Sequence, residues 1–356
     1  MPLTMPQATI SLLLKPGNDH SQMTNFRPIS MLNNDYKMFA KILAMRMETA
    51  ISSLIHLDQV GFIKGRFASD NMRRLFQVMA TASTLQHPAI AISLDAEKAF
   101  DRVEWHYLFH VMSKFGFGPV IISWVKALYN NPSASIKTNG TISKPFQLFL
   151  SGCPASPSLF ILALEPLVCA IRAERKITGI QIGGHDFKDN LFADDLLLTL
   201  SQPHESIPQV VKLIEVFGKF SGYKVNFNKR EANPLIPMTY SSHLGPAPIQ
   251  WKPQGMRYLG INIKTPIEDT FDLNGPLPLK TIREDSKRWT VLPISLWARA
   301  EVGKINILPR LLFLKSAIPL KSPLYCFKEI IKLFSDFLWS NKKQESDTKD
   351  HPDRGK

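Results

Sequence analysis

The chain has 356 residues, 44% hydrophobic and 21% charged, a composition typical of a globular protein with two or three subdomains. Lys and Arg outnumber Asp and Glu by 43 to 30, and the net charge of +13 favours nucleic acid over an anionic membrane as the partner. No apolar run is long enough to span a bilayer and the three cysteines form no C-x-x-C pair, so we expect a soluble intracellular protein without disulfide framework or zinc knuckle.

The first part of the chain, residues 1–87, is expected to be helix-rich with basic loops. Its clearest element is an amphipathic helix over residues 36–48, where apolar residues recur at helical spacing. A buried strand is expected at 89–94. A helix should follow over 103–115, because Gly116 and Gly118-Pro119 then interrupt the pattern.

The middle of the chain alternates hairpins and helices. Residues 135–138 and 146–150 predict a hairpin around Asn139-Gly140. After it we expect helices over 157–173 and 207–220, separated by a short strand at 180–182 and a second hairpin. Antiparallel hairpins with helices on one face indicate an α+β fold built on a split βαβ sheet.

The last third of the chain changes character twice. Five prolines between residues 233 and 254 predict a looped excursion, because proline disfavours both helices and central strands. A strand is expected over 257–263, and a basic helical bundle from about 279 to 339. The stretch 343–356 has no large apolar residue and is expected to be a disordered tail.

Asp194 and Asp195 stand between apolar residues in the second hairpin, Phe-Ala-Asp-Asp-Leu-Leu-Leu. Burying unpaired carboxylates is costly, so a pair of them in an apolar hairpin indicates a compensating hard metal ion. Asp95, which ends the apolar strand at 89–94, is the candidate for a third carboxylate, since a strand end and a hairpin tip in one sheet can meet. An arbitrary Asp pair is more often a solvated turn, and an Asp after a strand is more often a helix cap.

This arrangement resembles the palm of reverse transcriptases, most closely those of LINE-type non-LTR retrotransposons. An Asp ends a hydrophobic strand, Phe100 follows five residues later, and Phe-Ala-Asp-Asp lies in a hairpin. Further blocks occur in the same order and extend the resemblance from about residue 10 to 342: Lys15-Pro-Gly, Phe26-Arg-Pro-Ile-Ser, Gly61-Phe-Ile-Lys-Gly-Arg66, Asp70-Asn71, Gly152-Cys-Pro-Ala-Ser-Pro, Leu162-Ala-Leu-Glu-Pro-Leu, Gly222-Tyr-Lys-Val-Asn-Phe-Asn-Lys229 and Arg257-Tyr-Leu-Gly-Ile.

The resemblance implies a right-hand polymerase with fingers over residues 1–87, a palm over 88–270 that contains the Pro-rich excursion, and a helical thumb over 271–342. Its implied activity is RNA-directed DNA polymerisation, in which dNTPs are added to a primer 3′-hydroxyl on an RNA template. The implied partners are an RNA template, a DNA primer and dNTPs, without a membrane. The implied location is the nucleus or a cytoplasmic ribonucleoprotein.

The resemblance also implies roles for single residues. Asp95, Asp194 and Asp195 would hold two Mg²⁺ ions, with the Ala96 carbonyl as a further oxygen ligand. Phe100 would be the steric gate that excludes a ribose 2′-hydroxyl. The remaining implied contacts are Lys15 and Arg27 with the triphosphate, Gly152 with the nucleotide or template, Lys224 or Lys229 with the pyrophosphate, Gly65 and Arg66 with the template, and Lys287 and Arg288 with the template-primer.

One block departs from the family pattern. The family usually has Arg-Gln before Gly-Cys-Pro, whereas this chain has Leu150-Ser151. Together with the lack of blocks for flanking domains, this leaves open a remnant that binds nucleic acid through its basic grooves without turnover. A structural or interaction protein derived from a mobile element is a third hypothesis.

Overall fold

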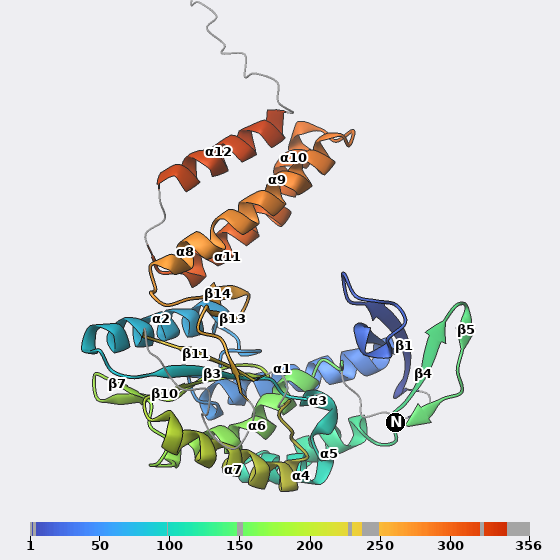
Figure 1. The fold of residues 1–356 in the computed structure, drawn as a ribbon. Helices are drawn as coiled ribbons and strands as arrows, with labels where there is room; N and C mark the ends of the chain where they lie inside the picture. The colour runs from blue at the N-terminus through green and yellow to red at the C-terminus, as the bar shows by residue number, and fades with distance from the viewer. Residues whose placement is uncertain are drawn as a thin grey trace, which may run out of the picture.

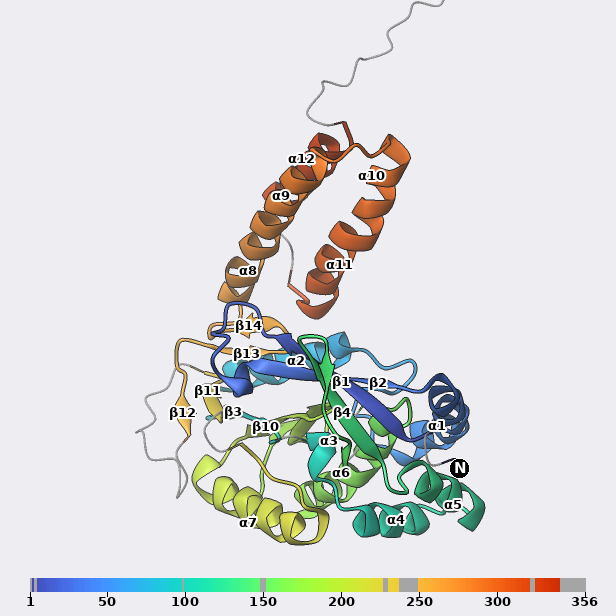
Figure 2. The same ribbon diagram turned by 90° about the vertical axis from the view of Figure 1, so that its right-hand side faces the viewer.

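The computed structural model describes residue 2 and residues 5–97, 99–147, 152–226, 230–236, 249–320 and 324–339. Three parts are visible in Figures 1 and 2: a sheet that contains β1 and β4, a layered block with α2 on one side and α6 and α7 on the other, and helices α8 to α12 standing above that block.

The central sheet has the strand order β12-β11-β3-β10-β9. Its middle strand is β3 (Ile90–Leu94), which pairs antiparallel with β10 (Asp195–Leu200) and with β11 (Glu231–Pro234). The edge strands are β9 (Asp189–Phe192), antiparallel to β10, and β12 (Gln250–Trp251), parallel to β11. The predicted strand at 89–94 and the predicted hairpin at Asp194-Asp195 are therefore confirmed, and they are neighbours in one sheet.

Both faces of this sheet are covered by helices, so the prediction of helices on one face was wrong. Ile92 and Leu198 belong to a core with α6 (Ser156–Ala173) and α7 (Pro203–Ser221). Ala91 and Leu197, with side chains on the opposite face, belong to a core with α2 (Ala68–Leu85) and α11 (Leu308–Ala317). The two strands are apolar on both faces, which is typical of a sheet buried on both sides.

A second sheet begins in the N-terminal part, where the sequence predicted mainly helix. Strand β1 (Gln7–Leu14) pairs antiparallel with β2 (Phe26–Leu32) and parallel with β4 (Ser133–Thr138). The turn predicted at Asn139-Gly140 is confirmed, but it joins β4 to β5 (Thr141–Ile142). The predicted partner contributes β6 (Phe146–Gln147), which pairs with the start of β4, and residues 148–150 lie outside the described part of the chain.

The helices under this second sheet form the largest core cluster. Helix α1 (Asn34–Leu54) contains the predicted helix at 36–48, and its N-terminus is capped by the Asn33 side chain, which accepts a hydrogen bond from the Asp35 N–H. It packs on α6 together with further helices from the middle of the chain. These are α3 (Ala99–Arg102), α4 (Trp105–Lys114) and α5 (Pro119–Leu128).

Two predictions near the Pro-rich segment need correction. The looped excursion begins later and ends earlier than 233–254, because residues 233 and 234 belong to β11 and residues 250 and 251 form β12; residues 237–248 lie outside the described residues. The single strand expected at 257–263 is a hairpin of β13 (Met256–Tyr258) and β14 (Ile261–Ile263). Leu259 and Gly260 have φ values of 45° and 84°, which suit a two-residue hairpin turn.

The C-terminal helices confirm the predicted bundle. They are α8 (Asp269–Asn274), α9 (Pro276–Thr290), α10 (Leu296–Val302), the π-helical turn η3 (Gly303–Ile307), α11 and α12 (Leu324–Trp339). A small core containing Ile282, Ile307 and Phe337 joins them. The tail at 343–356 lies outside the described residues.

Two short strands and one long helix complete the fold. Strands β7 (Ile180–Ile182) and β8 (His185–Phe187) form a hairpin, which confirms the strand expected at 180–182. Helix α6 is long and apolar enough to cross a membrane, but 61% of that span is buried inside the protein, as expected for a core helix.

Candidate active site

The Asp pair lies at the tip of the hairpin between β9 and β10. Phe192 pairs with Asp195, so Ala193 and Asp194 form a two-residue turn. Ala193 has a φ of 57°, a left-handed conformation that such turns need. The tight turn therefore leaves Asp194 at the tip and Asp195 at the first position of β10.

Asp95 follows the last residue of β3 on the adjacent strand. Leu94 pairs with Leu196, and continuing this antiparallel register by one residue sets Asp95 across from Asp195. On the other side, the Asn226 N–H donates to the Asp95 carbonyl at 2.8 Å. The three carboxylates predicted from sequence therefore come from two adjacent strand ends, with their backbone held by strand pairing.

The electrostatics of these carboxylates reflect their crowding. Burial, followed by the charges of Asp194 and Asp95, raises the pKa of Asp195 to about 6. Burial and the Asp95 charge also raise the pKa of Asp194. Negative charge on one carboxylate thus disfavours ionisation of its neighbours, and a bound cation would offset this repulsion.

The donor chemistry fits a hard divalent cation, because every side-chain donor is a carboxylate oxygen. Within the described ranges, no group of three or more His, Cys, Asp or Glu side chains is arranged so that it could hold a metal ion by itself. A site made by strand ends and open to substrate oxygens agrees with both facts, since Mg²⁺ commonly keeps ligands from phosphate and water.

Ala96 lies beside the carboxylates and is almost fully buried, with 7% of its surface exposed. It forms an antiparallel bridge with Val225, and the flanking Glu97 N–H donates to the Lys224 carbonyl at 2.9 Å. In this pattern the N–H and C=O of Ala96 point away from the 224–226 segment. The same bridge places Lys224, whose side chain is exposed, next to the strand end that carries Asp95.

Lys15 and Arg27 lie on the β1–β2 hairpin of the second sheet. Arg27 pairs with Leu13, and the Lys15 N–H donates to the Asn25 carbonyl at 2.9 Å. Because side chains alternate along a strand, Lys15 and Arg27 lie on the same face of the hairpin. The Lys15 ammonium donates to the Thr24 carbonyl at 2.8 Å, while Arg27 is exposed.

Phe100 lies on α3, five residues after Asp95, and is partly buried. Its ring lies 4.5 Å from the ring of Phe160 and 6.3 Å, nearly edge-on, from the ring of Phe62. Phe62 is 51% exposed and has a φ of 59°, which is unusual for a bulky residue. Sequence reasoning missed Phe62, whose only signal was its place in the Gly61-Phe-Ile block.

Gly152 has a φ of 97°, a conformation that other residues rarely adopt, and a Cβ built on it would lie 3.7 Å from the Cβ of Ser30 on β2. The segment before α6 thus approaches the second sheet. Lys229 and the departures at Leu150 and Ser151 lie outside the described residues.

Arg66 donates four hydrogen bonds to backbone carbonyls around the C-terminal end of α1. The acceptors are Ser52, Ile55, His56 and Gln59, at 2.9, 3.0, 2.6 and 2.7 Å. The preceding Gly65 has a φ of 80°, which turns the chain so that Arg66 reaches back. This geometry gives Arg66 an anchoring role, and the implied template contact stays a prediction.

Lys287 and Arg288 lie on α9 and are exposed. Lys287 lines a cavity of about 500 Å³ between α9 and α12, together with Arg283 and Lys332. Arg288 forms an ion pair with Asp285 instead. The two neighbouring basic residues, for which the sequence implied the same role, therefore have different surroundings.

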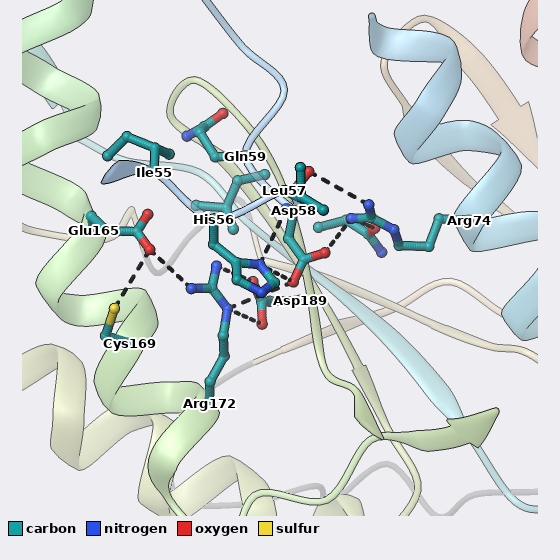
Figure 3. Close-up of polar contacts among 12 residues, drawn as sticks. Ile55, His56, Leu57, Asp58, Gln59, Arg74, Glu165, Cys169, Arg172 and Asp189 are labelled. Carbon is teal, nitrogen blue, oxygen red and sulfur yellow. Dashed lines mark hydrogen bonds and ion pairs between the residues drawn. The ribbon is translucent and has the colours of Figure 1, made fainter. Parts of the chain in front are cut away.

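A cluster of charged side chains behind the hairpin was not foreseen (Figure 3). Arg172 on α6 lies 2.9 Å from Glu165, 3.1 Å from Asp189 on β9, and 3.6 Å from Asp58 in the loop after α1. Asp58 also pairs with Arg74 on α2 at 2.5 Å. This charge cluster links the loop after α1, helices α2 and α6, and strand β9, which leads to the turn that carries Asp194.

Tyr223 is another residue that the sequence did not single out. Its side chain is 3% exposed, and its hydroxyl has no hydrogen-bond partner among the described residues. Burial, followed by the charges of Asp194 and Asp95, raises its pKa above the ordinary value. A neutral, buried phenol therefore forms part of the wall near the carboxylates.

A palm sheet with three carboxylates at its strand ends, a β-sheet finger part and a helical column above it define a right-hand polymerase fold. Telomerase from Candida tropicalis, solved with a TWJ fragment of telomeric RNA, aligns with 96% of this chain and 55% of its own at a TM-score of 0.55 and 12% identity. The apo form of that telomerase aligns with 95% of this chain and 63% of its own at a TM-score of 0.54 and 14% identity. At such low identities these similarities show a shared fold alone.

The family is established by sequence. The model of the family "Reverse transcriptase (RNA-dependent DNA polymerase)" matches residues 13–263. The chain is 30% identical over 281 residues to the transposon TX1 149 kDa protein of Xenopus laevis, covering 76% of this chain and 21% of that protein. It is 21% identical over 328 residues to the RNA-directed DNA polymerase from mobile element jockey of Drosophila melanogaster, covering 88% and 35%.

The chain therefore belongs to the reverse transcriptase family, with relatives among the RNA-directed DNA polymerases of non-LTR retrotransposons. It spans about a fifth to a third of the length of these two relatives. Its family is a nucleotidyltransferase family that generally uses divalent metal ions.

Proposed function

We propose that the chain copies RNA into DNA by adding dNTPs to the 3′-hydroxyl of a DNA primer. The observation that carries this proposal is the meeting of Asp95, Asp194 and Asp195 at two adjacent strand ends, where burial and the neighbouring carboxylates raise the pKa values of Asp194 and Asp195. Such a cluster is costly unless a cation binds it, and a cation there is what nucleotidyl transfer needs.

Asp95, Asp194 and Asp195 would hold two Mg²⁺ ions, with the Ala96 carbonyl as a further oxygen ligand. When bound, the ions lower the pKa of the primer hydroxyl and offset charge on the pyrophosphate. Asp194, at the tip of the turn, would face the primer end and the incoming nucleotide. Phe100, backed by Phe160 and flanked by Phe62, supplies a wall of rings where a ribose 2′-hydroxyl would otherwise fit.

The cationic side chains would bind the phosphates. Lys15 and Arg27 share one face of the β1–β2 hairpin and suit the triphosphate, for which a guanidinium gives paired hydrogen bonds. Lys224 or Lys229 would neutralise the pyrophosphate, and Gly152 would let backbone approach the nucleotide. Gly65 would lie against the template, and Lys287 with other exposed basic side chains would contact the phosphates of the template-primer.

We assign residues 1–87 to the fingers, 88–270 to the palm and 271–342 to the thumb. Strands β4 to β6 fall within the palm range, but β4 pairs with β1, and β5 and β6 pair with β4, so the fingers sheet includes a palm insertion. By family, the site of action would be the nucleus or a cytoplasmic ribonucleoprotein.

Primer extension tests the proposal. The purified chain should extend a DNA primer on an RNA template with dNTPs and Mg²⁺. Asp195→Ala should lower the rate by more than the roughly 10–100-fold that loss of a residue orienting a metal ligand costs. Asp272→Asn, an exposed Asp on α8, is the matched control and should keep full activity.

Absence of any Mg²⁺-dependent product from the unmutated chain would contradict the polymerase proposal. If that chain still binds RNA with a strong salt dependence, the alternative of a nucleic-acid-binding remnant is supported instead.

A further inference from the structure

The turn that carries the catalytic carboxylates is held from outside its own hairpin by the side chain of Gln59. The Gln59 amide donates to the Ala193 carbonyl at 3.1 Å, and its oxygen accepts from the Ala193 N–H at 3.0 Å. The same oxygen accepts from the Gly61 N–H at 2.9 Å. Gln59 is only 1% exposed, so these bonds are shielded from water.

The backbone around Gln59 runs alongside β9 like an additional short strand. The Leu191 N–H donates to the Asp58 carbonyl at 2.9 Å, and the Val60 N–H donates to the Leu191 carbonyl at 3.0 Å. Gln59 itself forms a parallel bridge with Leu191. Strand β9 is the last strand in the sheet order, but its outer side is not free, because segment 58–61 covers it.

Gly61 allows this close approach. A Cβ at Gly61 would lie 2.2 Å from the Ala193 nitrogen and 2.9 Å from the Phe192 carbonyl carbon, and both of these are backbone atoms that cannot move independently. Any larger residue would push segment 58–61 off the turn. A glycine is thus required here by contact, since Gly61 does not have a positive φ.

Segment 58–61 is itself anchored on the fingers side. Arg66 donates to the Gln59 carbonyl at 2.7 Å, and Asp58 is held by Arg74 and Arg172 in the charge cluster. Gln59, visible at the top of that cluster in Figure 3, therefore links an immobilised loop to the turn. Asp194 and Asp195 follow Ala193 directly in the chain, so their placement depends on Ala193.

We propose that Gln59 is a positioning residue for the catalytic turn, and that through Ala193 it fixes where the Asp194 and Asp195 carboxylates lie relative to Asp95. This inference rests on the proposed function and deepens it. The Gln59 side chain bonds to the backbone of Ala193 and Gly61, so it acts on the carboxylates through the backbone. Its loss should misplace the metal ligands without removing any of them.

Gln59→Met tests this inference, because methionine has a similar length and volume but cannot pair with the Ala193 and Gly61 backbone. The chain offers a matched control in Asn274 on α8, which is 4% exposed. The Asn274 amide accepts from the Asn262 N–H at 2.8 Å and donates to the Asn262 carbonyl at 2.7 Å. Asn274→Leu therefore breaks the same kind of backbone clasp on β14, away from the carboxylates.

The first measurements do not need polymerase activity. Mn²⁺ binding followed by electron paramagnetic resonance should weaken about 10–100-fold in Gln59→Met, as expected when a partner that orients metal ligands is lost. Hydrogen exchange should accelerate in the peptide covering 189–195. Asn274→Leu should leave Mn²⁺ affinity unchanged and accelerate exchange only around 262–274.

Activity gives an additional readout. In primer extension, Gln59→Met should lower kcat with little change in the KM for dNTP, because misplaced carboxylates affect the transition state more than substrate binding. Gly61→Ala should reproduce the kcat defect. A general loss of stability would instead lower the active fraction and leave Mn²⁺ affinity of the folded protein intact.

The inference is overturned if folded Gln59→Met matches the unmutated chain in Mn²⁺ affinity and in exchange at 189–195. If Gln59→Met does not fold, hydrogen exchange in the unmutated chain is the test. Rapid exchange at 189–195 would contradict the inference, and protection equal to that of β3 would support it. If the unmutated chain binds Mn²⁺ but does not extend primers, the proposed function fails while the Gln59 result still stands.

Discussion

At the scale of single residues, an arginine that was expected to bind nucleic acid has a structural role instead. Arg66 was expected to bind nucleic acid, yet its guanidinium donates to four backbone carbonyls. These carbonyls include that of Ser52 in the last turn of α1, where helical carbonyls lack partners within the helix. A guanidinium used in this way has few donors left for a phosphate.

Arg66→Gln is therefore expected to lower the free energy of unfolding by about 2–4 kcal/mol, because several charge-assisted hydrogen bonds to carbonyls are lost. Urea denaturation followed by circular dichroism measures this. The salt dependence of RNA binding should stay unchanged. Lys64→Gln, at an exposed position in the same loop, should not alter stability.

Two results together would contradict the anchoring role and support the phosphate contact that the family resemblance implies. In that case Arg66→Gln would leave stability unchanged and reduce the slope of log affinity against log salt by about 1.

At the scale of elements, the charge cluster joins four parts of the chain behind the hairpin. Glu165 and Asp189 are only 4% and 3% exposed, and Arg172 lies between them. Burial is the largest influence on Asp189, and against the lowering effect of Arg172 it raises the pKa of Asp189 to about 6. The cation therefore offsets only part of the cost of burying these acids.

Arg172→Met should destabilise the protein by about 3–5 kcal/mol at pH 7, since it leaves two buried carboxylates without their cation. The loss should shrink toward pH 5. A carboxyl whose pKa is raised in the folded state binds its proton more tightly there than in the unfolded chain, so its penalty falls as pH drops through the folded pKa. Urea denaturation at both pH values checks this.

Arg175→Met is the control for that series, because Arg175 is an exposed arginine just beyond the end of α6. It should change stability little at either pH. A loss in Arg172→Met that is equal at pH 5 and pH 7 would contradict the assignment to unpaired buried carboxylates.

At the scale of the whole molecule, the net charge of +13 is distributed over parts with different tasks. Some basic side chains are neutralised internally, as in the charge cluster and in the pair of Arg288 with Asp285. Others are exposed, as Lys287 is in the cavity between α9 and α12, which Lys332 and the ion pair of Arg283 with Glu329 also line. Net charge alone does not say which of them meet a polyanion.

Lys287→Gln is expected to weaken binding of an RNA–DNA duplex and to reduce the slope of log affinity against log salt by about 1, as for the loss of one phosphate contact. Fluorescence anisotropy over a range of salt concentrations measures this. Lys304→Gln should leave the slope unchanged, because Lys304 pairs with Glu301 at 2.8 Å. Equal slopes for Lys287→Gln and the unmutated chain would show that the cavity side of α9 does not meet the duplex.

Local sequence determined the elements whose pattern is strong and short in range. Periodic apolar residues identified the helices α1, α6 and α7, and a continuous apolar run identified β3. Prediction from local sequence failed where a strand pairs with a segment that lies far away in the chain. The apolar run over 257–263 reads as one strand because its two-residue turn is not obvious from sequence, and β1 pairs with β4 from a distant part of the chain, as Gln7 with Ser133.

The sequence by itself also indicated the reverse transcriptase family, because Asp95 after an apolar strand and Phe-Ala-Asp-Asp in a hairpin occur in the order typical of that family. What only the tertiary structure decided is how these carboxylates are held. Gln59 contacts Ala193 across 134 positions of sequence, and no local pattern encodes such a contact. The physical reason is that buried amides and charges are satisfied by whichever groups the folded chain brings near, so their roles appear only once the fold is formed.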